Sequence, residues 1–146
     1  MVTNIFNRIL IVEDNENDLE LSLDALSENN MANFIDIARD GEEALDYLYC
    51  RGNFSGRVKT NPIVILLDLK LPKVTGLEVL KDIKENESLK KIPVVILTSS
   101  REESDIIQSY SYGVNAYVVK PVEFHKFIEA VKQLGVFWAL LNEHPK

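Results

Sequence analysis

The sequence predicts an α/β fold in which parallel strands alternate with helices that cover both faces of one sheet. Short apolar runs recur along the 146-residue chain, and most are β-branched and do not alternate with polar residues. Amphipathic stretches with helix start signals separate these runs. Five strand–helix units of about 29 residues each match the size of a βαβ repeat.

Five apolar runs are expected to form the strands, and they span residues 9–12, 34–37, 63–67, 94–97 and 117–119. The second run alternates through Asp36, so we place it nearer an edge of the sheet. The natural arrangement is an open, doubly wound, flavodoxin-like parallel sheet of five strands in the order 2-1-3-4-5.

Five helices are predicted from apolar residues three and four positions apart. Two of them open with capping-box spacing, in which Asp or Thr precedes Glu by three positions. The connection 49–62 contains glycine, asparagine and serine and is expected to be a flexible loop. The predicted helix starts are Asp18, Asp40, Thr75, Ser100 or Ser104, and Val122, and the last helix runs to about Leu134.

Composition limits the class of protein. The net charge of −7 and pI of about 4.9 disfavour nucleic-acid binding, which relies on basic patches. The single cysteine, Cys50, excludes a disulfide framework and favours a reducing compartment. No signal peptide or apolar run of ~18–20 residues is visible, so we expect a cytoplasmic protein that does not enter a membrane. We expect a single domain over 1–146, with a core at 5–134 and a C-terminal extension at 135–146.

Chemically active side chains follow four of the predicted strands. Ligands of such sheets bind at the carboxyl ends of the strands, so these side chains should share one crevice. An acid after a strand often only begins the next helix, but this joint placement favours a site. Crowded carboxylates repel one another, and Mg²⁺, which prefers oxygen ligands, relieves that repulsion. The residues are Glu13 and Asp14 after the first strand, Asp68 after the third, Thr98 after the fourth and Lys120 after the fifth.

Four segments carry a resemblance to a known family. They read ILIVED at 9–14, LLDLKLP at 66–72 with Gly76, VVILT at 94–98 and GVNAYVVKP at 113–121. With Thr98 and Lys120 standing 30 and 52 residues after Asp68, the chain resembles a response-regulator receiver domain of two-component signalling. The segments 90–99, 109–115 and 137–138 resemble stand-alone receivers that partner phytochrome-type histidine kinases, and the long loop fits that subgroup.

The resemblance implies a signalling domain that catalyses only its own phosphotransfer and dephosphorylation. It implies that Asp68 accepts a phosphoryl group from a phosphohistidine of the kinase. Asp14 and Asp68 would hold Mg²⁺ with the backbone carbonyl of Lys70, and Glu13, where many members have Asp, would act mostly through water. Lys120 and the Thr98 hydroxyl would bind the phosphoryl oxygens.

By the same resemblance, the Lys120–Pro121 bond is expected to be cis. Thr98 moving toward the phosphoryl group would let Tyr117 swing inward and change the surface of the fourth helix, fifth strand and fifth helix. Tyr117 could instead be an ordinary half-buried strand aromatic. Lys70 and Ser100 flank the site and could tune the acyl-phosphate lifetime.

We expect a homodimer that uses the face between the fourth and fifth helices together with the C-terminal extension. If the last helix continues through Gly135, apolar residues fall on its polar face. Alternatively, Gly135 ends the helix and the tail folds back onto the core. The candidate interface residues are Val136, Phe137, Trp138 and Leu140.

Other functions fit less well. Glu13 and Asp14 would repel the phosphate of a flavin, and a haloacid-dehalogenase-type phosphohydrolase needs an acid where Lys70 stands. Neither a P-loop nor a Gly-x-Gly-x-x-Gly motif is present. The alternative that stays open is a receiver-like adaptor or phosphate sink without a conformational output.

Overall fold

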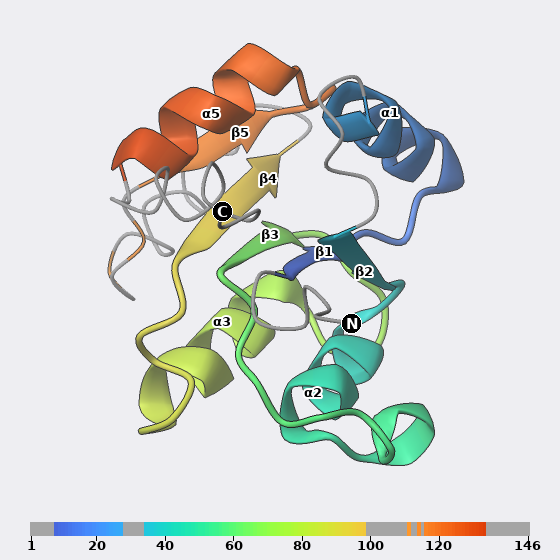
Figure 1. Cartoon of the computed structure of the whole chain (residues 1–146), viewed down its shortest axis with the longest axis vertical. Helices are drawn as coiled ribbons and strands as arrows, with labels where there is room; N and C mark the ends of the chain where they lie inside the picture. Colours follow the sequence, from blue (N-terminus) through green and yellow to red (C-terminus); the bar gives the residue numbers. More distant parts are fainter. Residues whose placement is uncertain (1–7, 28–33, 99–110, 112–113, 115, 134–146) are drawn as a thin grey trace, which may run out of the picture.

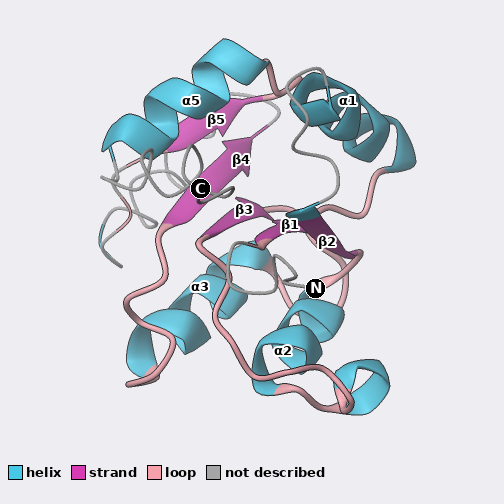
Figure 2. Cartoon of the chain, viewed as in Figure 1, coloured by secondary structure: helices cyan, strands magenta, loops and turns pink. Residues whose placement is uncertain are grey.

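A computed structural model describes residues 8–27, 34–98, 111, 114 and 116–133 of the chain. The sheet order is β2-β1-β3-β4-β5, and every neighbouring pair is parallel, which confirms the predicted topology (Figures 1 and 2). The elements are β1 (Ile9–Val12), α1 (Glu16–Ser27), β2 (Ile35–Ala38), α2 (Gly41–Tyr49), the 3₁₀ turn η2 (Gly52–Phe54), β3 (Val64–Asp68), α3 (Gly76–Glu85), β4 (Val94–Thr98), β5 (Tyr117–Val119) and α5 (Phe124–Gln133).

Strands β1, β3 and β4 are apolar without alternation because both faces of the sheet are buried there. In β1, Leu10 and Val12 pack on one face with α2 and α3, whereas Ile9 and Ile11 pack on the other with α1 and α5. Figure 1 shows the same division, with α1 and α5 on one side of the sheet and α2 and α3 on the other. The second strand lies at the edge, as its alternating pattern predicted.

Helix starts follow the predicted caps in two places and differ from the prediction in two others. Asp40 accepts a hydrogen bond from Glu43 N at the start of α2, and Thr75 and Glu78 form a full capping box on α3. The prediction that α1 begins at Asp18 is wrong, because Asn15 Oδ1 accepts from Asp18 N and the helix starts two residues earlier.

The last described helix, α5, begins at Phe124 rather than at the predicted Val122. The carbonyl of Glu123 accepts the bond from Phe127 N, so Glu123 stands at the helix start. The described residues hold four α-helices rather than the predicted five. The predicted helix from Ser100 or Ser104, and Val136, Phe137, Trp138 and Leu140, lie outside the described residues.

The connection 49–62, predicted to be a flexible loop, contains η2 and is held by one arginine. Arg57 donates to the carbonyl of Tyr47 at 2.9 and 2.7 Å and to those of Val58 and Thr60 at 3.2 and 3.0 Å. Its guanidinium also lies 3.9 Å from the centroid of the Tyr47 ring. Because α2 buries that ring, the arginine ties the loop to the core.

The described helices include none that is long and apolar enough to cross a membrane.

Candidate functional site

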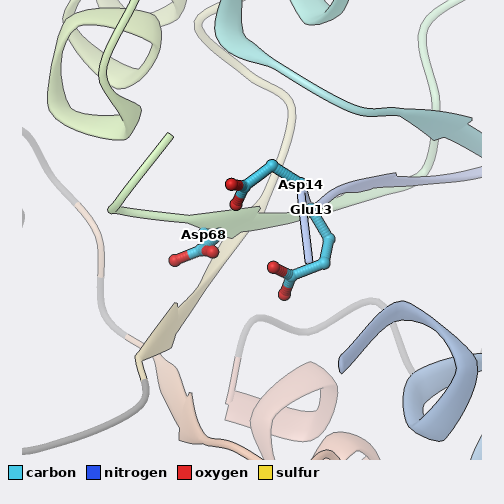
Figure 3. Close-up of side chains that lie close together, drawn as sticks. All are labelled: Glu13, Asp14 and Asp68. Atoms are coloured by element: carbon cyan, nitrogen blue, oxygen red, sulfur yellow. The ribbon is translucent and has the colours of Figure 1, made fainter. Parts of the chain in front are cut away.

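Three carboxylates meet at the carboxyl ends of β1 and β3. Glu13 and Asp14 follow β1 directly, and Asp68 is the last residue of β3. One oxygen from each lies within 4.8 Å of the others, and Figure 3 shows the side chains gathered at these strand ends. We call Glu13, Asp14 and Asp68 the carboxylate cluster. It forms because β1 and β3 are parallel neighbours whose ends lie at one edge of the sheet.

The three side chains of the carboxylate cluster differ in solvent exposure. Glu13 and Asp68 are 0% and 4% exposed, whereas Asp14 is exposed to solvent. Glu13 Oε2 accepts a 3.2 Å hydrogen bond from Asn15 N, and Asp68 Oδ1 accepts a 3.1 Å bond from Lys70 N. The buried carboxylates are therefore oriented by the backbone that follows each strand.

Lys120 brings a positive charge to the cluster. Its ammonium Nζ lies 2.9 Å from Glu13 Oε1, 3.0 Å from Asp68 Oδ2 and 3.0 Å from Asp18 Oδ2. Asp18 was not among the predicted site residues, because its contact with Lys120 joins residues 102 positions apart and no local pattern signals it. Three carboxylates contact the ammonium and a fourth, Asp14, belongs to the carboxylate cluster, so the site carries excess negative charge and attracts a cation.

The pKa values of Glu13 and Lys120 reflect this arrangement. Burial raises the pKa of the Glu13 carboxyl from its ordinary 4.5 to about 7; the bond from Lys120 offsets only part of the rise, and Asp68 adds to it. Burial would lower the pKa of the Lys120 ammonium. Hydrogen bonds to Glu13 and Asp18 and the charge of Asp68 outweigh burial, so that pKa is raised.

Thr98 and Tyr117 lie on the two strands beyond β3. Thr98 ends β4, is 4% exposed, and its carbonyl accepts a 2.7 Å hydrogen bond from Lys120 N. Tyr117 begins β5 and is 44% exposed. The Lys120–Pro121 peptide bond is cis, as expected. The structure thus brings Glu13, Asp14, Asp68 and Lys120 together, with Thr98 at the adjacent strand end.

Gly76 allows the loop after Asp68 to fold back against β3. A Cβ at position 76 would lie 2.2 Å from the carbonyl oxygen of Asp68 and 2.5 Å from Leu69 Cα. Gly76 N also donates a 3.0 Å hydrogen bond to Leu69 O. Because both clashes are with backbone, only glycine permits this approach beside Asp68.

A doubly wound sheet with an acidic cluster and a lysine at its strand ends is typical of the receiver domains of two-component signalling, and the family comparison agrees. The response regulator receiver domain family matches residues 9–132, and the chain belongs to this family.

Among relatives, the chain is 40% identical over 130 residues to response regulator Rcp1 of Synechocystis, covering 89% of this chain and 87% of Rcp1. Solved structures of similar proteins include the bacteriophytochrome response regulator AtBRR, with 59% identity, a TM-score of 0.86 and coverage of 94% and 98% of the two chains. The phosphorylated cyanobacterial phytochrome response regulator RcpA has 40% identity, a TM-score of 0.74 and coverage of 91% and 94%. Rcp1 itself has been solved in an Mn²⁺-bound form, with 39% identity, a TM-score of 0.72 and coverage of 90% and 94%.

Proposed function

We propose that this protein is a two-component response regulator that accepts a phosphoryl group from a histidine kinase onto Asp68. The proposal covers 1–146 as a single receiver domain with a core at 5–134 and an extension at 135–146. The observation that carries it is the 3.0 Å contact between Lys120 Nζ and Asp68 Oδ2 within the carboxylate cluster. A nucleophilic carboxylate beside a fixed ammonium has the geometry that phosphoryl transfer requires.

In the proposed transfer, an oxygen of Asp68 forms a bond to phosphorus while the bond from phosphorus to the imidazole nitrogen of the phosphohistidine breaks. The imidazole leaves with the bonding electron pair and is protonated, and Asp68 becomes an acyl phosphate. Lys120 is already within hydrogen-bonding distance of Asp68, so it can bind the oxygens of the arriving group. The Thr98 hydroxyl is proposed to donate to these oxygens after transfer.

The carboxylate cluster fits Mg²⁺. Its three acidic side chains offer oxygen atoms within 4.8 Å of one another, and hard divalent cations prefer such ligands. Asp14, Asp68 and the Lys70 carbonyl are proposed to hold the ion, with Glu13 acting mostly through water. When bound, Mg²⁺ would neutralise charge on the phosphoryl oxygens. The Mn²⁺-bound form of Rcp1 supports a divalent cation in this family.

A groove beside the site offers a surface for the kinase. The groove is about 740 Å³ and lies between α1 and the start of α5, with Leu21, Ala25, Val122 and Phe124 in its lining. Leu21 is 48% exposed and lies in the lining of this groove, so it offers apolar surface to a partner. We propose that an apolar helix of the kinase, carrying the phosphohistidine, docks here. The similarity to AtBRR and RcpA supports a phytochrome-type kinase.

The proposed output is a change in the surface formed by β5 and its neighbours. Tyr117 stands at the edge of a hollow of about 440 Å³ that Lys126 and Glu129 also line. Thr98 and Tyr117 lie on paired strands, so a movement of Thr98 can be transmitted to β5. We propose that Tyr117 moves inward on phosphorylation. Lys70 and Ser100 are proposed to tune the lifetime of the acyl phosphate.

A homodimer is proposed to form through the surface around β5 together with the C-terminal extension. The extension residues proposed for this interface are Val136, Phe137, Trp138 and Leu140.

The deciding experiment is phosphotransfer from a phytochrome-type histidine kinase to the wild-type protein and to Asp68→Asn, read on phosphate-affinity gels. Wild type should be labelled and Asp68→Asn should not; equal labelling of both overturns the assignment.

Leu21→Asp should slow transfer from the kinase but not phosphorylation by acetyl phosphate. Light scattering that gives a monomer mass at all concentrations, with and without phosphorylation, would exclude the homodimer.

A further inference from the structure

The Lys120 ammonium is held by three carboxylates, and only two of them belong to the carboxylate cluster. Its contacts to Glu13 and Asp68 are 2.9 and 3.0 Å long. The third, at 3.0 Å, is to Asp18 on α1. An ammonium has three N–H donors, so one donor is available for each carboxylate.

Asp18 differs from Glu13 and Asp68 in the solvent exposure of its side chain and in the hydrogen bond that its own backbone makes. Its side chain is 31% exposed, against 0% for Glu13 and 6% for Asp68. It therefore lies at the mouth of the site. Its backbone N–H donates a 2.9 Å hydrogen bond to Asn15 Oδ1, so the first turn of α1 fixes the backbone of Asp18 independently of Lys120.

A divalent cation changes the balance among these three contacts. A cation within the carboxylate cluster attracts the oxygens of Glu13 and Asp68 and repels the nearby ammonium. The contact to Asp18, outside the cluster, is affected least. Without Asp18, the carboxylates left to Lys120 would be Glu13 and Asp68, both of which belong to the cluster that the cation occupies.

We propose that Asp18 is a positioning residue that keeps the Lys120 ammonium at the mouth of the site, beside Asp68, while a divalent cation occupies the carboxylate cluster. Lys120 is then in place for the oxygens of the incoming phosphoryl group. This inference rests on the proposed phosphoryl transfer to Asp68. In it, Asp18 acts through Lys120 and does not itself contact the transferred group.

The first test uses acetyl phosphate, a small donor that needs no kinase docking, at saturating Mg²⁺. Asp18→Asn should lower the rate constant of phosphorylation roughly tenfold, as expected for loss of one charge-assisted hydrogen bond. Asp18→Glu should recover most of the rate. The matched control is Glu20→Gln, which removes one charge from an exposed position of the same helix and should change the rate by less than about twofold.

A double-mutant cycle separates positioning from a structural role. In a Lys120→Ala background, adding Asp18→Asn should change the residual rate by less than about twofold, because the group that Asp18 positions is gone. If Asp18→Asn slows phosphorylation equally with and without Lys120, Asp18 acts in another way and the inference is wrong.

A further measurement does not depend on phosphorylation. Trace acetylation with acetic anhydride, followed by peptide mass spectrometry, reports how available the Lys120 amine is. At saturating Mg²⁺, Asp18→Asn should raise acetylation of Lys120 roughly tenfold over wild type, and Asp18→Glu should not. Equal acetylation in all three proteins would contradict the inference. If acetylation behaves as expected but wild type is never phosphorylated, the proposed function fails and the positioning role stands.

Discussion

Lys120 Nζ and Asp68 Oδ2 lie 3.0 Å apart although 52 residues separate them in the chain. The contact forms because β3 ends at Asp68 and β5 ends one residue before Lys120, at the same edge of the sheet. The two strands are not neighbours; β4 lies between them, so Lys120 reaches across the end of β4. Both side chains are nearly buried, at 8% and 6% exposure, and water screens their interaction weakly.

Mg²⁺ is predicted to stabilise the protein through Asp14. At a Mg²⁺ concentration of about 100 Kd, the free energy of unfolding of the wild type should rise by about 2.7 kcal/mol. Asp14→Asn should remove most of this gain, and because Asp14 is exposed the substitution leaves no buried group unpaired. Urea unfolding in Mg²⁺ and in EDTA measures both values. Glu20→Gln is the control, and an undiminished Mg²⁺ effect in Asp14→Asn would show that Asp14 is not a ligand.

Glu13 is predicted to make the metal-free protein less stable as pH rises. Its folded pKa of about 7 lies above its ordinary 4.5, so the folded state binds the proton more tightly than the unfolded state. The contribution of protonated Glu13 to the free energy of unfolding is complete below pH 4.5 and is lost as pH rises through 7. The full difference corresponds to about 3 kcal/mol.

The measurement is urea unfolding in EDTA from pH 4.5 to 8, taken as wild type minus Glu13→Gln so that other titrating groups cancel. Saturating Mg²⁺ should shrink or reverse this pH dependence, because the cation favours the ionised carboxylate. A difference that does not change with pH would mean that Glu13 titrates alike in the folded and unfolded states.

Gly76→Ala is predicted to destabilise the fold and to disturb Asp68. The added Cβ would meet the Asp68 carbonyl oxygen at 2.2 Å, and backbone cannot move away as a side chain can. We expect a loss of about 3 kcal/mol in urea unfolding and slower phosphorylation by acetyl phosphate. Gly56→Ala is the matched control, since a Cβ there has no atom within 4 Å. Similar losses in both variants would rule out the close approach as the cause.

Arg57→Met is predicted to loosen the loop 49–62. The substitution leaves the carbonyls of Tyr47, Val58 and Thr60 without their hydrogen bonds from Arg57. We expect a loss of about 2 kcal/mol in urea unfolding and faster hydrogen exchange in the loop. Arg51→Met should cost less than about 0.5 kcal/mol, because the ion pair of Arg51 with Asp46 lies at the surface. Equal losses would show that Arg57 does not hold the loop.

The sequence pattern predicted the strands closely because their signal is local. Each apolar run lies within one residue of the strand that it predicts, so the end of each strand was predicted to within one residue. The Asp40 and Thr75 caps were also visible, since the capping partner stands three positions along the chain. The start of α1 was misplaced because Asn15 and Asp18 are both common capping residues, and periodicity alone does not choose between them.

The sequence by itself determined the order of strands and helices, the caps, and the residue types that stand at each strand end, because periodicity and capping depend on positions a few residues apart. Only the tertiary structure decided that Asp18 joins Glu13 and Asp68 around Lys120, that burial raises the pKa of Glu13, and that Arg57 holds the loop. Those relationships depend on strand register and on how α1 and α5 pack on one face of the sheet, which bring together atoms that lie far apart in the chain.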